Sequence, residues 1–229
     1  MHLITILLFV AIATLMIDSL LEMAFISSMV YWLNHGASGP YEINRNGRIF
    51  SLHSAPRRLL TDQGHTSNGA AGTAFVLIGL GGIVALLLAR PLSPRHRLLG
   101  WLYRAWLVLT VPATLLTLAA LIYVNVVTSK HSGQTIDLDL VVSSGVPYPV
   151  DSWTPQNWFS AVLKLPLTDD DTESKIAHHL RIMNGWRWNL IPLFVIELGV
   201  CVLAFVEARM WRRRGRYAAP AFQGGVEAK

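Results

Sequence analysis

Residues 72–89 read GTAFVLIGLGGIVALLLA, a run of 18 residues without a charged side chain. The hydrocarbon core of a bilayer is about 30 Å thick, and an α-helix needs about 20 apolar residues to cross it. Helix is the expected state, because backbone N–H and C=O groups in lipid must be satisfied within their own segment. This stretch therefore predicts a transmembrane helix.

Three further apolar blocks accompany this stretch, at 3–33, 98–127 and 190–206. Only 14% of the 229 residues are charged and 52% are hydrophobic, whereas a soluble domain carries about 25% charged residues. The predicted fold class is an α-helical integral membrane protein: a four-transmembrane-helix bundle with a small extracellular or lumenal β-sheet and short helices. The lipid bilayer is thus the first expected partner.

The apolar blocks predict how the chain is divided. Only His2 precedes the first block, where a signal peptide would carry a positive charge, so the block is interpreted as a retained span. Transmembrane helices are expected at 1–33, 72–90, 98–127 and 189–209. The other segments are a non-cytoplasmic loop with a β-hairpin at 34–71, a cytoplasmic loop at 91–97, a non-cytoplasmic loop with a strand and amphipathic helices at 128–188, and a basic cytoplasmic tail at 210–229.

Lys and Arg predict the orientation, because cytoplasmic loops carry an excess of both. Residues 90–97 hold three arginines in eight residues, whereas 34–71 hold four in 38 and 128–189 hold five basic residues in 62. We therefore expect both termini in the cytoplasm, and the protein in the plasma membrane or an endomembrane.

The tail adds a cluster of basic residues after the fourth block. Its Arg212, Arg213, Arg214 and Arg216 are candidate contacts with anionic lipid headgroups. The net charge of +5 follows the expected topology, so no nucleic-acid partner is predicted.

The two long loops show signs of folded structure. Asn46-Gly47 between strand-like runs is a strong hairpin signal. Apolar residues alternate over 135–142, which predicts a further strand with one buried face. Together they predict a small antiparallel sheet over the helix ends.

A short helix is expected after Thr154, a suitable N-cap that is followed by Pro155. Its apolar face, with Trp158 and Phe159, has two interpretations of equal weight: a cap on the bundle or a helix lying on the membrane. The acidic run at 169–173 predicts the start of another helix.

Aromatic residues near the ends of the blocks predict membrane–water belts, where Trp and Tyr are enriched. They are Tyr31, Trp32, Trp101, Tyr103, Trp186 and Trp188.

Three carboxylates lie inside apolar blocks. Asp18 and Glu22 are four residues apart and share one face of the first helix, and Glu197 lies near the middle of the fourth block. Acids in a membrane are costly and face the bundle or a wet cavity. The leading interpretation is that they hydrogen-bond to polar residues of other helices, namely Ser27, Thr110, Thr114, Thr117 or Asn125.

Two alternatives stay open for this intramembrane polar cluster. The acids could form a proton relay or capture a ligand. With His178 or His179 they could instead bind a metal such as iron or manganese, although no Glu-x-x-His pair is present. No cofactor is otherwise predicted, and Cys201 is expected to be a small core residue.

The layout resembles the claudin-like tetraspan superfamily, which implies cytoplasmic termini, four helices and a small extracellular sheet. The Gly-Leu-Trp motif and paired cysteines of that family are missing here, so no functional residue is carried over. The segments 153–158 and 185–189 are also similar to fungal membrane proteins, a similarity that implies no activity.

Three functions remain open from the sequence. The first is a non-enzymatic tetraspan that organises partners or lipid, with homo-oligomers or other membrane proteins as partners. The second is a small membrane-embedded enzyme on a lipophilic substrate, similar to the four-helix anthrone oxygenases of fungi. The third is a proton-coupled transport component that uses Asp18, Glu22 and Glu197.

Overall fold

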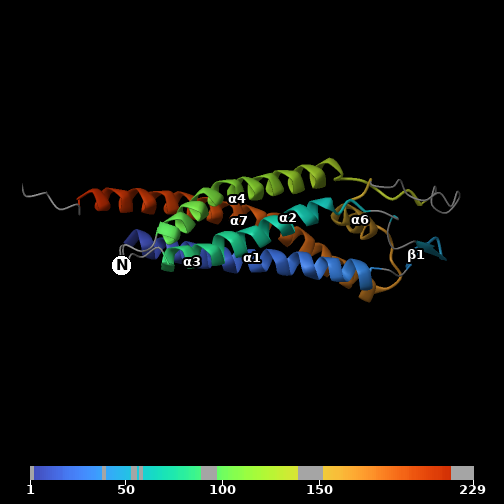
Figure 1. Ribbon diagram of the computed structural model, residues 1–229. Helices are drawn as coiled ribbons and strands as arrows, with labels where there is room; N and C mark the ends of the chain where they lie inside the picture. Colours follow the sequence, from blue (N-terminus) through green and yellow to red (C-terminus); the bar gives the residue numbers. More distant parts are fainter. Residues whose placement is uncertain are drawn as a thin grey trace, which may run out of the picture.

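The computed structural model describes residues 3–37, 40–52, 56, 59–88, 97–138 and 152–217. Four helical rods run side by side along its long axis (Figure 1). They are α1 (Leu3–His35), the continuous rod of α2 (Asp62–Thr73), η1 (Ala74–Leu80) and α3 (Gly81–Leu88), then α4 (Arg97–Lys130) and α7 (Asp170–Tyr217). All four rods are long and apolar enough to cross a membrane. The predicted set of four apolar helices is therefore confirmed.

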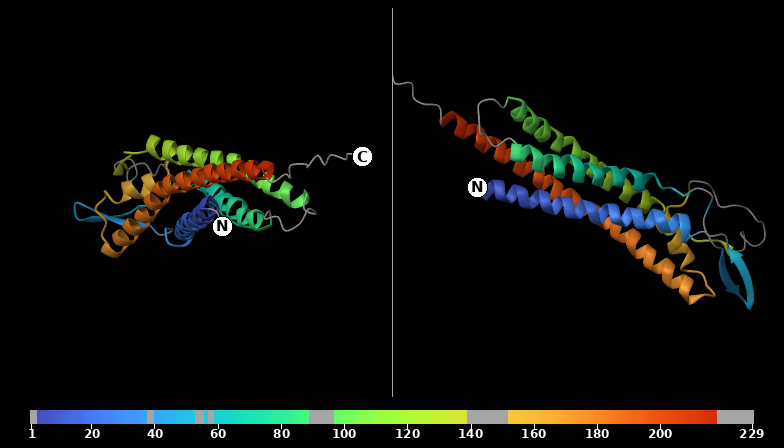
Figure 2. Two further views of the ribbon diagram at one scale, coloured as in Figure 1. Left: turned by 90° about the vertical axis from the view of Figure 1, so that its left-hand side faces the viewer. Right: turned by 60° about the horizontal axis from the view of Figure 1, so that its bottom comes forward.

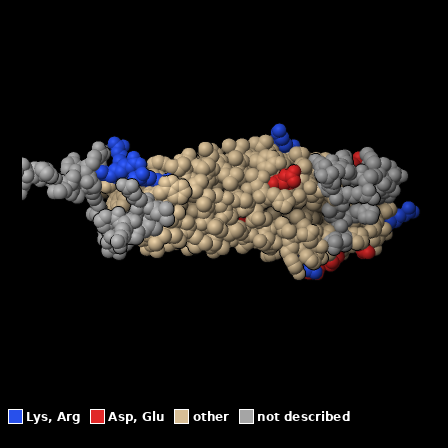
Figure 3. Space-filling model, viewed as in Figure 1, with Lys and Arg blue, Asp and Glu red and all other residues tan. Residues whose placement is uncertain are grey.

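The molecule has two unlike ends. The start of α1, the end of α3 and the C-terminal part of α7 lie at one end, here called the basic end (Figure 2). The β-strands and the short helix α6 (Pro155–Val162) lie at the other, here called the hairpin end. Figure 3 shows the charged side chains gathered toward the two ends, with an almost uncharged band between them.

The helices expose apolar side chains that a soluble protein would bury. Ile17 is 62% exposed, Val108 65% and Val195 58%. Within the most apolar window of each rod, 22–39% of the residues are buried in the protein. An apolar surface of this extent suits a hydrocarbon surrounding and would aggregate in water.

One stripe of α1 faces the other helices. Its buried members recur at alternating steps of four and three residues, the spacing of the seam in helix bundles. They are Leu8, Ile12, Leu15, Ser19, Glu22, Ile26 and Met29.

The second rod contains a π-helical segment, η1, which the sequence analysis did not predict. Gly79 within η1 and Gly82 just after it let neighbouring side chains approach: a Cβ on Gly79 would lie 2.5 Å from Met16 Cγ, and one on Gly82 would lie 2.8 Å from Trp106 Cζ2. Trp106 Nε1 donates a 3.1 Å hydrogen bond to the Ile78 carbonyl. The wider helical turn thus provides a backbone acceptor for α4.

The predicted hairpin is confirmed. Strands β1 (Tyr41–Arg45) and β2 (Arg48–Leu52) pair antiparallel, with Tyr41 opposite Leu52. Asn46 and Gly47 have positive φ values of 53° and 78°, as a two-residue hairpin turn of type I′ requires.

The predicted strand at 135–142 is wrong over its described part. Residues 135–137 form neither strand nor helix, and 139–142 lie outside the described residues. Ile136 is buried and Leu138 packs against the core. The alternating apolar residues therefore contribute side-chain packing without strand pairing. The hairpin's neighbour is instead 166–168, where Asn44 N–H donates to Pro166 O at 2.9 Å and Thr168 N–H to Glu42 O at 3.1 Å.

Helix α6 begins where the sequence predicts. The Thr154 hydroxyl accepts from the Asn157 N–H at 3.3 Å, and Pro155 occupies the first turn. Trp158, Phe159 and Val162 are fully buried. A helix lying on a membrane would leave this face uncovered by protein, so the structure supports the bundle-cap interpretation.

Helix α7 is longer than predicted. The expected loop helix and the fourth span form one helix from Asp170 to Tyr217, which passes through Pro192 without ending. Proline removes one backbone hydrogen bond, but packing of the surrounding residues on α1 and α4 keeps the helix continuous.

We predict that Gly82→Ala destabilises the protein and Gly81→Ala does not. The new methyl at position 82 meets the Trp106 ring, which is fixed by its bond to Ile78, whereas at position 81 the nearest atoms lie at 3.6 and 3.7 Å. Overpacking typically costs about 1–3 kcal/mol, and the helix propensity gained by Gly→Ala is up to about 1 kcal/mol. Thermal unfolding in detergent should show a lower midpoint for Gly82→Ala only. Equal midpoints for both variants would contradict this close packing.

Candidate functional site

The carboxylates of Glu22 and Glu197 are buried inside the bundle, with exposed fractions of 0% and 1%. Each is hydrogen-bonded to a different helix. Glu22 Oε2 accepts from Asn189 Nδ2 of α7 at 3.0 Å, and Glu197 Oε2 is bonded to Thr117 Oγ1 of α4 at 2.5 Å. Both acids thus join pairs of helices, and Thr117 is one of the partners that the sequence analysis proposed.

The three acids do not meet at one point. Glu22 lies at the level of Asn189, and Glu197 lies eight residues further along α7, about 12 Å at 1.5 Å per residue. Asp18 is half-buried and lies one turn from Glu22 toward the basic end, about 6 Å along α1. The carboxylates therefore occupy three successive levels of the bundle.

Each of these acids keeps one buried oxygen without a hydrogen-bond partner in the described part of the chain. The atoms are Asp18 Oδ2, Glu22 Oε1 and Glu197 Oε1. Buried polar atoms are usually paired, so these three are the least satisfied groups on the described α1 and α7.

A single turn of α7 hydrogen-bonds to all three other rods. Trp186 Nε1 donates to Ser67 Oγ of α2 at 3.0 Å, and Arg187 Nε donates to Asn125 Oδ1 of α4 at 2.9 Å. Asn189 completes the set through its bond to Glu22 of α1. We call Trp186, Arg187 and Asn189 the polar girdle. It fixes the helices relative to one another near the hairpin end.

The contact between α7 and α4 carries further polar pairs toward the basic end. The first two pairs are Arg187 with Asn125 and Glu197 with Thr117. Closer to the basic end, Cys201 pairs with Thr110 at 3.4 Å and Glu207 with Tyr103 at 2.5 Å. These four pairs, here called the α4–α7 rungs, follow one antiparallel register. Cys201 is partly buried in this contact, whereas the sequence analysis expected a small core residue.

The two histidines lie away from the acids. His179 is ten residues before Asn189 on α7, so its level is about 15 Å from that of Glu22. Its ring stacks on Trp32 at 4.3 Å, and His178 is exposed on the neighbouring face. Among the described residues, no three His, Cys, Asp or Glu side chains gather so as to hold a metal ion. The structure thus does not bring together the metal set considered from the sequence.

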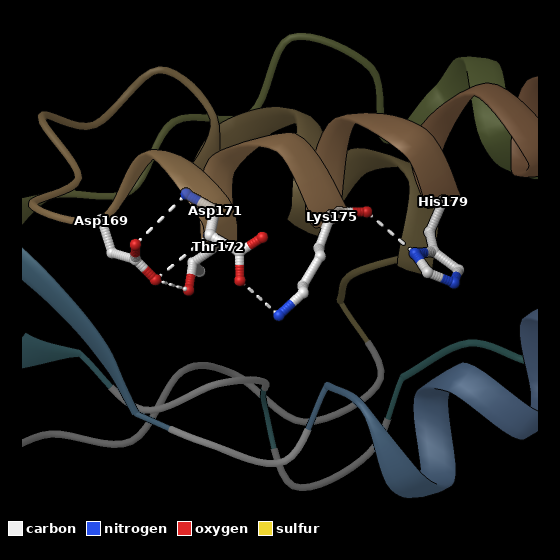
Figure 4. A network of polar contacts seen from close by, with 5 residues as sticks. All are labelled: Asp169, Asp171, Thr172, Lys175 and His179. Atoms are coloured by element: carbon white, nitrogen blue, oxygen red, sulfur yellow. Dashed lines mark hydrogen bonds and ion pairs between the residues drawn. The ribbon is translucent and has the colours of Figure 1, made fainter.

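His179 belongs to a chain of local contacts at the start of α7 (Figure 4). Asp169 caps the helix, accepting from the Thr172 hydroxyl at 2.5 Å and from the Asp171 N–H at 3.2 Å. The Thr172 bond, followed by the Asp171 N–H, holds the pKa of Asp169 below its usual value. Lys175 pairs with Asp171, and its carbonyl bonds His179 Nδ1 at 2.8 Å. These exposed contacts stabilise the helix start, as expected from its acidic first turn.

The aromatic residues divide into two groups. Tyr31, Trp101 and Trp188 are 68%, 68% and 55% exposed, as membrane belts require. Trp32, Tyr103 and Trp186 are buried and join helices, so for them the belt interpretation is wrong. Each exposed residue is within two positions of a buried one, as in Tyr31 and Trp32, so the sequence could not show which of the two faces outward.

The basic tail is described only in part. Arg212 is exposed near the end of α7, and Arg213, Arg214 and Arg216 continue the same helix. Their place at the basic end agrees with the expected contact with lipid headgroups, which stays a prediction.

A cavity of about 540 Å³ opens between α1 and α2 near the hairpin end. Met29, Val30 and Leu33 of α1 form one wall, and Gln63, His65 and Asn68 of α2 form the other. Trp186 of the polar girdle also lines it. The sequence analysis missed this cavity, since no motif marks a space between two helices.

Comparison of the chain with protein-family models, curated proteins and solved structures finds no match. The resemblance to claudin-like and fungal tetraspan proteins therefore stays a prediction, and the assignment of function depends on the residues described above.

Proposed function

We propose that this chain is a non-enzymatic integral membrane protein of four spans that organises membrane partners or lipid through its hairpin-end domain and helix surfaces. One observation carries the proposal: the hairpin end is a packed platform fixed to the helices. Trp32 of α1 lies between Phe159 of α6 and His179 of α7, with ring centroids at 4.5 and 4.3 Å. A platform of this kind presents its outer face in one orientation to a partner.

The hairpin carries an exposed apolar side chain. Ile43 on β1 is 1% exposed and packs in the protein core, whereas Ile49 on β2 is 64% exposed. An exposed large apolar side chain next to the exposed Arg48 is suited to contact with another protein. Partners in the same membrane, including a second copy of this chain, are the class we propose.

The buried acids support the same proposal. Glu22 and Glu197 are each used to bond one helix to another, the role that polar residues commonly have between membrane helices. The oxygenase-like alternative has less support, because the histidines that motivated it lie about 15 Å along α7 from the Glu22 level.

A proton path is the second candidate, favoured by one specific observation. Asp18, Glu22 and Glu197 lie on three successive levels, and each has a buried oxygen without a partner among the described residues. Carboxyls spaced along a bundle are typical of proton-translocating membrane proteins. Four spans would have to oligomerise to form a transport unit.

The proposed orientation places the basic end in the cytoplasm and the hairpin end outside or in a lumen. Its support is the density of Arg and Lys at the basic end. Both the plasma membrane and an endomembrane agree with this proposal.

The organiser proposal predicts protein cross-links from the hairpin. A photoreactive amino acid at position 49 should give defined adducts in native membranes, because this side chain points away from the protein. Position 175, also exposed but on the side of α7, serves as the matched control and should give fewer. A chain that remains monomeric and uncross-linked at position 49 contradicts the proposal.

The orientation predicts opposite labelling of two engineered cysteines. In a Cys201→Ala background, Arg48→Cys should react with an impermeant maleimide in intact cells, or in lumen-open vesicles if the protein is in an endomembrane. Arg212→Cys should react only from the cytoplasmic face. Both native side chains are exposed, so folding is not expected to change. Labelling of both positions from one side would exclude four spans.

The buried acids distinguish the two candidate functions. Under the organiser proposal, Glu22→Gln and Glu197→Gln keep the hydrogen bonds, and cross-linking from position 49 remains. Glu197→Leu removes the partner of Thr117 and should cost about 0.6–1.7 kcal/mol in stability, the range for hydrogen bonds between membrane helices. The measurements are thermal unfolding and proton flux into vesicles that carry a pH-sensitive dye. Proton flux that both Gln variants abolish would establish the second candidate instead.

A further inference from the structure

The cavity between α1 and α2 is lined by both apolar and polar side chains. On α1 its lining extends over the ten residues from Ile26 to His35, about 14 Å along the helix. The apolar side chains Ile26, Met29, Val30 and Leu33 all come from α1, whereas α2 contributes only glycine and amide and imidazole side chains. A volume of about 540 Å³ lies within the range of sites for single small ligands.

The polar groups of the cavity are uncharged. Ser27, Tyr31, Asn34, His35, Thr61, Gln63, His65 and Asn68 line it, and the described lining contains no Lys, Arg, Asp or Glu. A phosphate or carboxylate headgroup would lack a Lys or Arg partner there. The lining therefore favours a ligand without charged groups, and these eight hydrogen-bonding side chains exceed what a single hydroxyl could use.

One lining residue keeps an acceptor available. His35 Nδ1 bonds to the Tyr31 carbonyl at 3.0 Å, so Nδ1 donates and Nε2 is the acceptor of the neutral ring. Gln63 Oε1 also lacks a partner in the part of the chain that the structure describes, but it is buried in the protein and does not face the cavity. A ligand with a hydroxyl or amide donor would satisfy His35 Nε2.

We propose that this cavity binds an uncharged lipid whose head carries both hydroxyl and amide groups, of the ceramide class. The head would meet polar side chains such as His35 and Asn68, and a hydrocarbon chain would lie along Met29, Val30 and Leu33. A sterol offers one hydroxyl to eight polar side chains, and a phospholipid brings a phosphate group for which the described lining holds no Lys or Arg. The proposal deepens the lipid part of the proposed function and depends on α1 and α2 spanning a membrane.

The test uses a photoreactive, clickable ceramide on the full-length protein in vesicles. Labelling should saturate, be competed by unlabelled ceramide and map to peptides of α1 and α2. Gly64→Leu should lower it at least about five-fold, because Gly64 lines the cavity and a Cβ there meets no protein atom within 4 Å. Gly69→Leu is the matched control: it lies on the same helix, has equally open space and does not line the cavity, so labelling should persist.

A second pair of variants fills the cavity from the opposite wall. Val30→Trp should also reduce labelling, and Val10→Trp should not, since both valines are about half exposed on α1 but only Val30 lines the cavity. Thermal unfolding of each variant confirms folding, and the second pair decides the matter if Gly64→Leu does not fold.

Three outcomes would overturn the proposal. They are labelling insensitive to both cavity-filling variants, equal labelling of the same peptides by a photoreactive sterol, and equal labelling by a photoreactive phosphatidic acid. None of them affects the cross-links expected from position 49. Failure of the lipid site and failure of the organiser function are therefore distinguishable.

Discussion

The polar girdle on α7 is the feature on which the arrangement of the helices depends. In a hydrocarbon surrounding, apolar side chains gain little from leaving lipid for protein, so close packing and hydrogen bonds between helices decide how a bundle associates. Here Trp186, Arg187 and Asn189 each bond to a different rod within one turn. This turn fixes the rotation of α7 and, through it, the position of α1, α2 and α4.

The α4–α7 rungs extend this constraint along the bundle. One hydrogen bond between membrane helices is typically worth about 0.6 kcal/mol, so no single rung holds the helices together. Together they fix the axial position of α7 against α4, because sliding α7 by one turn would break Glu197–Thr117 and Glu207–Tyr103 at once. Close contacts at Gly79 and Gly82 fix the second rod in the same way, by packing that only a missing Cβ permits.

The sequence predicted those features that depend on local signals. Hydropathy located four apolar helices, Asn46-Gly47 located the hairpin, and Thr154-Pro155 located α6. What it could not predict depends on partners distant in the chain. The alternation at 135–142 indicated a strand, but packing uses Ile136 without pairing it. The acids were identified from the sequence as residues that join helices. However, only the antiparallel register of α1 and α7 shows that Asn189 is the partner of Glu22 and that the acids lie at three levels.

The platform and the cavity share structural parts, which has a consequence for how they act. Pro155 begins α6 and lines the cavity, and Trp186 lines the cavity and belongs to the polar girdle. Four residues after Pro155, Phe159 packs on Trp32 beneath the hairpin end. A ligand in the cavity would therefore contact the first residue of the helix that supports the platform. By thermodynamic linkage, a ligand that changes the affinity of a partner for the platform has its own affinity changed by the same factor when the partner binds.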